Sequence, residues 1–147
     1  MCEIWRKNNQ DEMTLEQIEA LFSQFRRLDG IRITGGEPFL RSDLSKIVNI
    51  IQRHTNPGVV HITTNGFLTE RIIEFTKSVD NPYKIHFKIS IDAVGEKHDD
   101  IRGVPGAYKE ALDTLRELAR LMTSRNYPGK EISLSQAFLK IVMEISG

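Results

Sequence analysis

Three strand-like runs, each followed by a helical segment, set the fold class of this chain. Runs of β-branched and apolar residues begin near residues 31, 59 and 85, so their starts are 28 and 26 residues apart. The segments between them repeat apolar residues at helical spacing. Regular alternation at the length of a βα unit predicts an α/β fold with a parallel sheet.

Local signals give approximate limits for the elements. Strands are expected at residues 31–33, 59–64, 84–92 and 132–134, and helices at 14–28, 43–54, 69–78 and 107–125. Thr14 and Gln17 have capping-box spacing, Asp29-Gly30 is a typical helix end, and Thr69 is the expected cap of the third helix. Residues 93–106 are polar and rich in glycine and proline, which predicts a loop longer than a βα connection needs.

The run at 84–92 alternates apolar and polar side chains without a fault. Its two faces are Ile85, Phe87, Ile89 and Ile91 on one side, and His86, Lys88, Ser90 and Asp92 on the other. A parallel strand covered by helices on both faces is apolar on both sides. The polar face therefore favours a barrel with helices outside and a ligand-lined interior, although an exposed antiparallel strand explains this segment when it is taken alone.

Counting the elements predicts an incomplete barrel. The chain has about three to four βα units, and a helix rather than a strand opens the series. We therefore expect residues 1–147 to form a single domain that is a partial parallel (β/α) barrel, with its first strand missing and unpaired sheet edges on both sides.

A stiff corner at Gly35, Gly36, Glu37 and Pro38 follows the strand at 31–33, which we expect to be buried. The glycines let the backbone turn, and Pro38 restrains Glu37 to extended conformations. A carboxylate held in this way at the end of a strand suits a cation. A phosphate cradle is disfavoured, because Glu37 would repel phosphate and no lysine follows at P-loop spacing. A plain βα turn with a solvated Glu37 is the other alternative.

Two further strand ends carry polar groups. Thr64 and Asn65 follow the run at 59–64, and Ser90 and Asp92 close the run at 84–92. Ligands of parallel α/β folds gather at the C-terminal ends of strands. These groups are therefore candidates to meet Glu37 around one polar ligand, whereas hydration by water or a helix-capping role is the simpler reading of Ser90 and Asp92.

Charge and cysteine content exclude several classes. Lysine plus arginine equals aspartate plus glutamate at 20 each, so no overall field favours nucleic acid or an anionic membrane. The sequence has neither a long apolar run nor a signal-like N-terminus, so a soluble cytoplasmic protein is expected. One cysteine, Cys2, excludes a disulfide framework and a metal site made of this chain's cysteines alone.

The corner and Cys2 together resemble the radical S-adenosylmethionine (radical SAM) superfamily. The stretch Gly35 to Pro38 matches that family's Gly-Gly-Glu-Pro corner, and Cys2 looks like the third cysteine of its Cys-x-x-x-Cys-x-x-Cys loop, whose first two cysteines are absent here. The motif His98-Asp99-x-Ile101-Arg102-Gly103 is similar to the branch that carries a SPASM or twitch extension. Members of that branch often modify peptides or build cofactors.

The resemblance implies a radical SAM fold, cofactors and site residues. It implies that Glu37, within its corner, binds the amino group of S-adenosylmethionine (SAM), and that Cys2 binds one iron of a [4Fe-4S] cluster. The residues implied to bind SAM are Gly35, Gly36, Glu37, Pro38, Thr64, Asn65, Ser90, Asp92 and Arg102. Ser90 and Asp92 would contact its ribose or carboxylate, and Arg102 would lie near the carboxylate. No side chain is assigned a catalytic role.

The resemblance also implies an oxidoreductase or maturase. The complete enzyme would cleave SAM reductively, with flavodoxin or ferredoxin as reductant, and its 5'-deoxyadenosyl radical would abstract hydrogen from an unknown substrate, such as a peptide or a cofactor precursor. Because one thiolate cannot hold the cluster, we expect the 147 residues as written to be an inactive fragment. The alternatives are a cluster-free module that binds SAM or another nucleoside, a partner subunit, and a non-functional remnant.

Overall fold

A four-stranded parallel sheet forms the centre of the protein. The computed structural model describes residues 12–123 and 132–134, so Cys2 and the apolar stretch at 137–143 lie outside the described residues. The strands are β1 (Gly30–Ile33), β2 (Val59–Thr64), β3 (Ile85–Ile89) and β4 (Ile132–Leu134), and they pair in that order. The predicted α/β class with a parallel sheet is confirmed.

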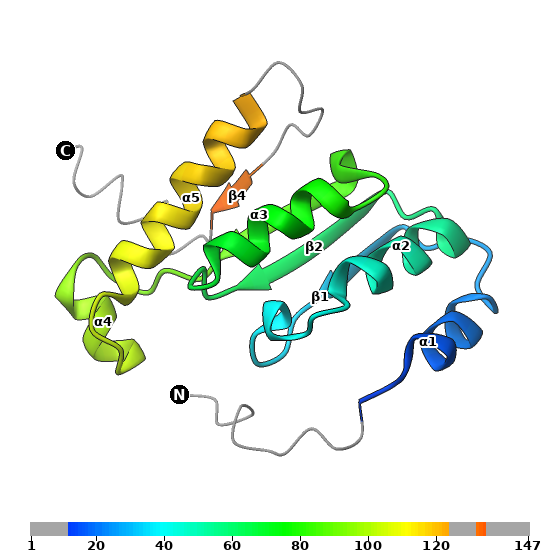
Figure 1. Ribbon diagram of the computed structural model, residues 1–147, viewed down its shortest axis with the longest axis horizontal. Helices are drawn as coiled ribbons and strands as arrows, with labels where there is room; N and C mark the ends of the chain where they lie inside the picture. Colours follow the sequence, from blue (N-terminus) through cyan, green and yellow to red (C-terminus); the bar gives the residue numbers. More distant parts are fainter. Residues whose placement is uncertain (1–11, 124–131, 135–147) are drawn as a thin grey trace.

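Helices connect successive strands and cover one face of the sheet (Figure 1). The α-helices are α1 (Leu15–Phe22), α2 (Leu44–Thr55), α3 (Thr69–Ser78), α4 (Glu96–Arg102) and α5 (Ala107–Thr123), and the 3₁₀ turns are η2 (Pro38–Leu40) and η3 (Pro82–Lys84). Along the sheet α1 contacts α2, α2 contacts α3, and α3 contacts α5. Strands in sequential order with every crossover helix on one side are the arrangement of a partial (β/α) barrel.

The main core lies between the sheet and its helices. Val60 and Ile62 of β2 and Phe87 of β3 are fully buried, and they pack with Ile72 of α3 and Leu118 of α5. The predicted alternation is confirmed, because Ile85, Phe87 and Ile89 of β3 are buried, as is Ile91 just beyond the strand, whereas the polar side chains between them are not. The face of the sheet away from the helices is therefore polar, as the barrel prediction requires.

Two predictions near the N-terminal side of the sheet were wrong. The helix that begins after Thr14 has the expected capping box, but it ends at Phe22 rather than at residue 28. Phe25 is exposed and therefore adds little burial to favour a longer helix, and the Leu28 N–H donates to the Thr55 carbonyl at the end of α2 (3.2 Å). The side chains of β1 that face the helices are only half-buried, because β1 is an edge strand.

Two further corrections concern helices. Residues 93–106 are not simply a loop, since α4 lies within them between Gly95 (φ 61°) and Gly103 (φ 68°), and its acidic first turn suits the helix dipole. Thr69 does not cap α3: it is the first helical residue, and its hydroxyl lies 2.5 Å from that of Thr114 in α5. The other helices and strands agree with the predicted limits to within a few residues.

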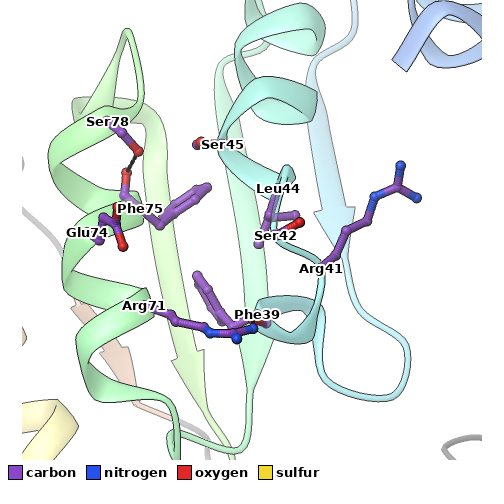
Figure 2. A pocket seen from close by; sticks show the side chains of 9 residues that line it. All are labelled: Phe39, Arg41, Ser42, Leu44, Ser45, Arg71, Glu74, Phe75 and Ser78. Carbon is purple, nitrogen blue, oxygen red and sulfur yellow. Dashed lines mark hydrogen bonds between the residues drawn. The ribbon is translucent and has the colours of Figure 1, made fainter. Parts of the chain in front are cut away.

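Aromatic packing supports the segment that follows β1. Phe39 in η2 is buried, and its ring meets that of Phe75 in α3 edge to face, with centroids 5.4 Å apart. Figure 2 shows the two rings beside a cavity of about 380 Å³ between η2, the start of α2, and α3. Arg71 closes one side and donates to the Phe39 carbonyl (3.1 Å). This cavity lies on the helix side and contains none of the site residues expected from the sequence.

Candidate functional site

The backbone of the corner at Gly35 to Pro38 has the conformation that its glycines and proline predict. Gly35 has φ 147°, and a Cβ there would have no heavy atom within 4 Å, so the conformation rather than lack of space requires glycine. Glu37 is extended (φ −126°, ψ 112°), as a residue before proline should be. Pro38 begins η2, and α2 starts only at Leu44. The corner therefore fixes where the Glu37 side chain starts.

The carboxylate of Glu37 is held by neutral donors from two segments. Its Oε1 accepts from the Thr64 hydroxyl (2.8 Å) and the Phe39 N–H (3.2 Å), and its Oε2 accepts from the Asn65 N–H (2.7 Å). Among residues 12–123, no lysine, arginine or histidine bonds to this carboxylate. This half-buried carboxylate is thus oriented by three neutral groups and retains an unused acceptor position.

Thr64 and Asn65 shape the end of β2 as well as holding Glu37. The buried Thr64 hydroxyl accepts from the Gly66 N–H (3.0 Å), and the Asn65 side chain accepts from the Phe67 N–H (2.9 Å). Gly66 (φ 80°) also allows α5 to come close, since a Cβ there would lie 3.2 Å from the Cα of Ala111. The strand end is thus a rigid turn that offers a fixed N–H to Glu37.

The end of β3 joins this network through its backbone. The Ser90 N–H donates to the Thr64 carbonyl (2.9 Å), and the Ser90 carbonyl accepts from Arg102 Nη2 (3.0 Å). Arg102 Nε lies 2.8 Å from Asp92 Oδ2, as an ion pair rather than a well-aligned hydrogen bond. Glu37, Thr64, Asn65, Ser90, Asp92 and Arg102 therefore form one connected set across three strand ends.

His98 of α4 fixes the backbone beyond β3. Its side chain is fully buried, and its Nδ1 accepts from the Asp92 N–H (3.1 Å), which requires the neutral tautomer with the proton on Nε2. Within the described parts of the chain that Nε2 has no hydrogen-bond partner. Burial lowers the pKa of His98, and the charge of Arg102 lowers it further, against the opposing charges of Asp92 and Asp99.

Asp99 ties the same helix to α5. Its carboxylate accepts from the N–H groups of Gly106 and Tyr108, both at 2.7 Å, at the start of α5. We call His98, Asp99 and Arg102 the α4 clamp, because they connect the end of β3 to α4 and α5. Sequence reasoning placed Arg102 near the ligand but assigned no role to His98 or Asp99. The four-residue spacing of His98 and Arg102, which puts both on one helical face, could have revealed the clamp if residues 96–102 had been recognised as a helix.

The corner also borders a pocket. A cavity of about 660 Å³ lies beside it, and its lining includes Ile18 of α1, Ile33 of β1 and Leu44 of α2 together with the four corner residues. Its walls are largely apolar, with the Glu37 corner on one side. This composition suits a ligand that has a charged group and an apolar body.

Two absences concern only the described residues. No three histidine, cysteine, aspartate or glutamate side chains of residues 12–123 converge as metal ligands would. In the same residues, none of the helices combines the length and apolar character needed to cross a membrane. The predicted ligand of iron, Cys2, lies outside the described residues.

Comparison with known families identifies the fold. The family model described as "Radical SAM superfamily" matches residues 1–129. The chain belongs to the radical SAM superfamily. The partial (β/α) barrel described above is thus of radical SAM type, and the resemblance seen at Gly35 to Pro38 is confirmed at the level of the family.

Curated relatives are similar over most of this chain. The GTP 3',8-cyclase of Alkaliphilus metalliredigens is 34% identical over 125 residues, covering 80% of this chain and 37% of the relative. That of Campylobacter jejuni subsp. doylei is 36% identical over 88 residues, covering 60% and 25%. That of Haemophilus ducreyi is 29% identical over 139 residues, covering 87% and 40%. The chain therefore spans between a quarter and two fifths of these relatives.

Membership of the superfamily implies SAM and a [4Fe-4S] cluster for the complete protein. The described residues fit the two groups unequally. Glu37, with three neutral donors and no cation, fits the ammonium group of SAM. Residues 12–123 contain no set of side chains that could bind the cluster. Assignment of the SPASM or twitch branch stays a prediction.

Proposed function

We propose that this chain supplies the SAM-binding part of a radical SAM enzyme. The observation that carries the proposal is the Glu37 carboxylate, which three neutral donors orient and which no cationic side chain of the described region neutralises. An ammonium group placed at the unused acceptor position completes the charge balance. The amino group of the methionine moiety of SAM is the proposed occupant.

Arg102 is the proposed partner of the ligand's carboxylate. Its Nη2 donates to Ser90 and its Nε faces Asp92, whereas Nη1 makes no hydrogen bond within the described residues. A carboxylate could take that remaining donor group. Glu37 and Arg102 would then bind the two charges of the methionine moiety, while Ser90 and Asp92 face the nucleoside side. Gly35, Gly36, Pro38, Thr64 and Asn65 keep Glu37 in place.

The cluster belongs to the complete enzyme in this proposal. When bound, it supplies the electron that cleaves SAM, and the protein's own residues bind and orient SAM and exclude water. Cys2 would hold one iron. Flavodoxin or ferredoxin as reductant, a peptide or cofactor precursor as substrate, a single domain over residues 1–147 and a cytoplasmic location are parts of the same proposal.

Calorimetric titration of the iron-free 147-residue chain with SAM tests the proposal. We expect binding, and Glu37→Gln should weaken it by roughly 10- to 100-fold, because a hydrogen bond to a charged group is lost. Glu74→Gln, at an exposed glutamate of α3, is the matched control and should bind as the unchanged protein does. Equal SAM affinity for the two variants would overturn the role of Glu37.

A cluster-free SAM-binding module is the second candidate, because residues 12–123 lack a set of metal ligands. Anaerobic reconstitution with iron and sulfide tests whether the chain alone can hold a cluster. We expect the chain alone to take up no stable cluster and to cleave no SAM. Uptake of roughly four irons per chain, with the broad absorption of a [4Fe-4S] cluster, would show that this expectation is wrong.

A further inference from the structure

His98 is a buried ionisable side chain to which the proposed function assigns no role. Among the buried polar side chains of the described residues, it alone can gain or lose a proton near neutral pH, and its exposed fraction is 0%. Its Nδ1 accepts from the Asp92 N–H (3.1 Å), and within the described residues this is the only hydrogen bond of the ring. The imidazole therefore makes a single backbone contact, at the end of the sheet where the polar strand-end residues meet.

His98 and Arg102 hold the segment that follows β3 from one side of α4. They lie four residues apart, so their side chains leave the helix on the same face. His98 accepts from the Asp92 N–H, and Arg102 Nη2 donates to the Ser90 carbonyl (3.0 Å). The Asp92 carboxylate in turn lies beside Arg102, with Oδ2 2.8 Å from Nε. The orientation of the guanidinium therefore depends on where residues 90–92 lie relative to α4, and the His98 contact helps to set that position.

The contact between His98 and Asp92 requires a neutral imidazole. The imidazolium form has an N–H at both ring nitrogens, so its Nδ1 would meet the Asp92 N–H donor to donor. The groups that face the ring within the described residues are Arg102 and Asp99 of α4, Asp92 beyond β3, and Tyr108 of α5, whose ring centroid lies 6.1 Å away. Burial and then the charge of Arg102 lower the pKa of His98, against the two carboxylates. One added proton would break the contact and place a second cation beside Arg102.

We propose that neutral His98 is a positioning residue for Arg102, holding the guanidinium through Asp92 in the orientation that leaves Nη1 open to a carboxylate ligand. His98 itself does not touch the ligand. A proton on the imidazole releases the Asp92 N–H, so the ligand's carboxylate loses an aligned donor and binds more weakly. That the ligand is SAM rests on the function proposed above; that His98 positions Arg102 does not.

Two variants of the full 147-residue chain separate positioning from packing. His98→Asn keeps an acceptor oxygen at the place of Nδ1 but takes up no proton, whereas His98→Leu has a similar size and no acceptor. Calorimetry at about pH 7.5 should give nearly unchanged SAM affinity for His98→Asn and roughly tenfold weaker affinity for His98→Leu. Equal affinities of the two variants would overturn the proposal. Melting curves by circular dichroism verify that each variant is folded.

The pH profile of SAM binding is a readout that a purely structural role would not change. Between about pH 7.5 and about pH 5.5, the affinity of the unchanged chain should fall by roughly tenfold as His98 gains its proton. His98→Asn should lose most of this fall. His54→Asn, at a half-buried histidine of α2 that lies beside Glu19, is the matched control and should keep it. A fall of the same size in His98→Asn would contradict the proposal.

NMR of the chain without ligand tests the positioning directly. At about pH 7.5 the Asp92 amide nitrogen and His98 Nδ1 should show a scalar coupling across their hydrogen bond. As the pH falls, the coupling should vanish, and the Arg102 Nε–H resonance should shift with the same midpoint as the His98 ring. In His98→Asn the Arg102 resonance should stay in place. An Arg102 resonance that does not follow the titration of His98 would show that the proposal is wrong.

These measurements keep the positioning role apart from the proposed function. If no form of the chain binds SAM but the Arg102 resonance follows His98, the positioning role stands and the proposed function fails. If the unchanged chain binds SAM and both His98 variants bind it equally well at every pH, the proposed function stands and the positioning role fails.

Discussion

Glu37 and Asp92 are carboxylates that follow parallel strands of one sheet, yet their surroundings differ. Glu37 is half-buried and accepts from a hydroxyl and two backbone N–H groups. Asp92 is 41% exposed at its side chain and is paired with Arg102. The first carboxylate keeps a charge that a ligand can use, whereas the second is balanced by a neighbour. A polar residue at a strand end is therefore a stronger candidate for cation binding when only neutral groups orient it.

Phe39→Ala gives the largest expected effect and tests what supports the Glu37 corner. The buried ring packs against Phe75 and Phe87, so its removal should lower the free energy of unfolding by about 3–5 kcal/mol in urea denaturation. Leu40→Ala, at a neighbour that is 64% exposed, should change it by less than about 0.5 kcal/mol. Similar losses in both variants would mean that η2 is not anchored by its core ring.

Asp92→Asn, measured beside Glu37→Gln, is the most direct test of the difference between the two carboxylates. Because Arg102 already balances Asp92, its neutral variant should weaken SAM binding by only about 2- to 5-fold, well below the loss expected for Glu37→Gln. Calorimetry at one ionic strength measures both. If Asp92→Asn costs as much affinity as Glu37→Gln, the distinction between a usable and a balanced carboxylate is wrong.

Asp99→Ala measures how much the α4 clamp contributes by tying α4 to the start of α5. The variant loses two hydrogen bonds to the first N–H groups of α5, which should destabilise the fold by about 1–2 kcal/mol. Asp100→Ala, at the exposed next residue of α4, serves as the control. If urea denaturation gives the same free energy of unfolding for the two variants, Asp99 does not belong to the clamp.

The pH dependence of stability is the smallest expected effect. The pKa of His98 is lower in the folded chain than its ordinary value of about 6.5. At pH values between the folded-state and unfolded-state pKa, the unfolded chain therefore binds more protons, and stability rises with pH. Stability should be level above about pH 7 and fall as the pH drops below about 6.5. His61 acts in the same direction, so His98→Asn should reduce the slope without abolishing it. An unchanged slope would contradict the role of burial.

The sequence predicted the elements whose signals are local. The spacing of the strand runs indicated the parallel sheet, alternation from Ile85 to Ile91 indicated its buried face, and the corner at Gly35 to Pro38 indicated an oriented carboxylate. It did not predict that Thr64 and Asn65 hold Glu37, although both were expected beside the ligand. That contact joins residues 27 and 28 positions apart, which only the strand register brings together.

The errors arose where tertiary contacts outweigh local pattern. Apolar residues continue at helical spacing past Phe22, but the helix stops there and Phe25 stays exposed. The stretch at 93–106 looked like a loop because glycine and proline punctuate it, while burial of His98 against the end of β3 stabilises a short helix there. Cys2 lies outside the described residues, so its role as a ligand of iron stays a prediction.

The backbone N–H of Asn65 provides a spectroscopic reporter on the carboxylate opposite it. Because that proton lies on Glu37 Oε2 (2.7 Å), its chemical shift should move when Glu37 gains a proton or a cation. The amide of Ser90, bonded to the Thr64 carbonyl, sits one link further along the same network. Two amide resonances thus allow occupancy of the corner to be followed without a labelled ligand, an iron cluster or a catalytic assay.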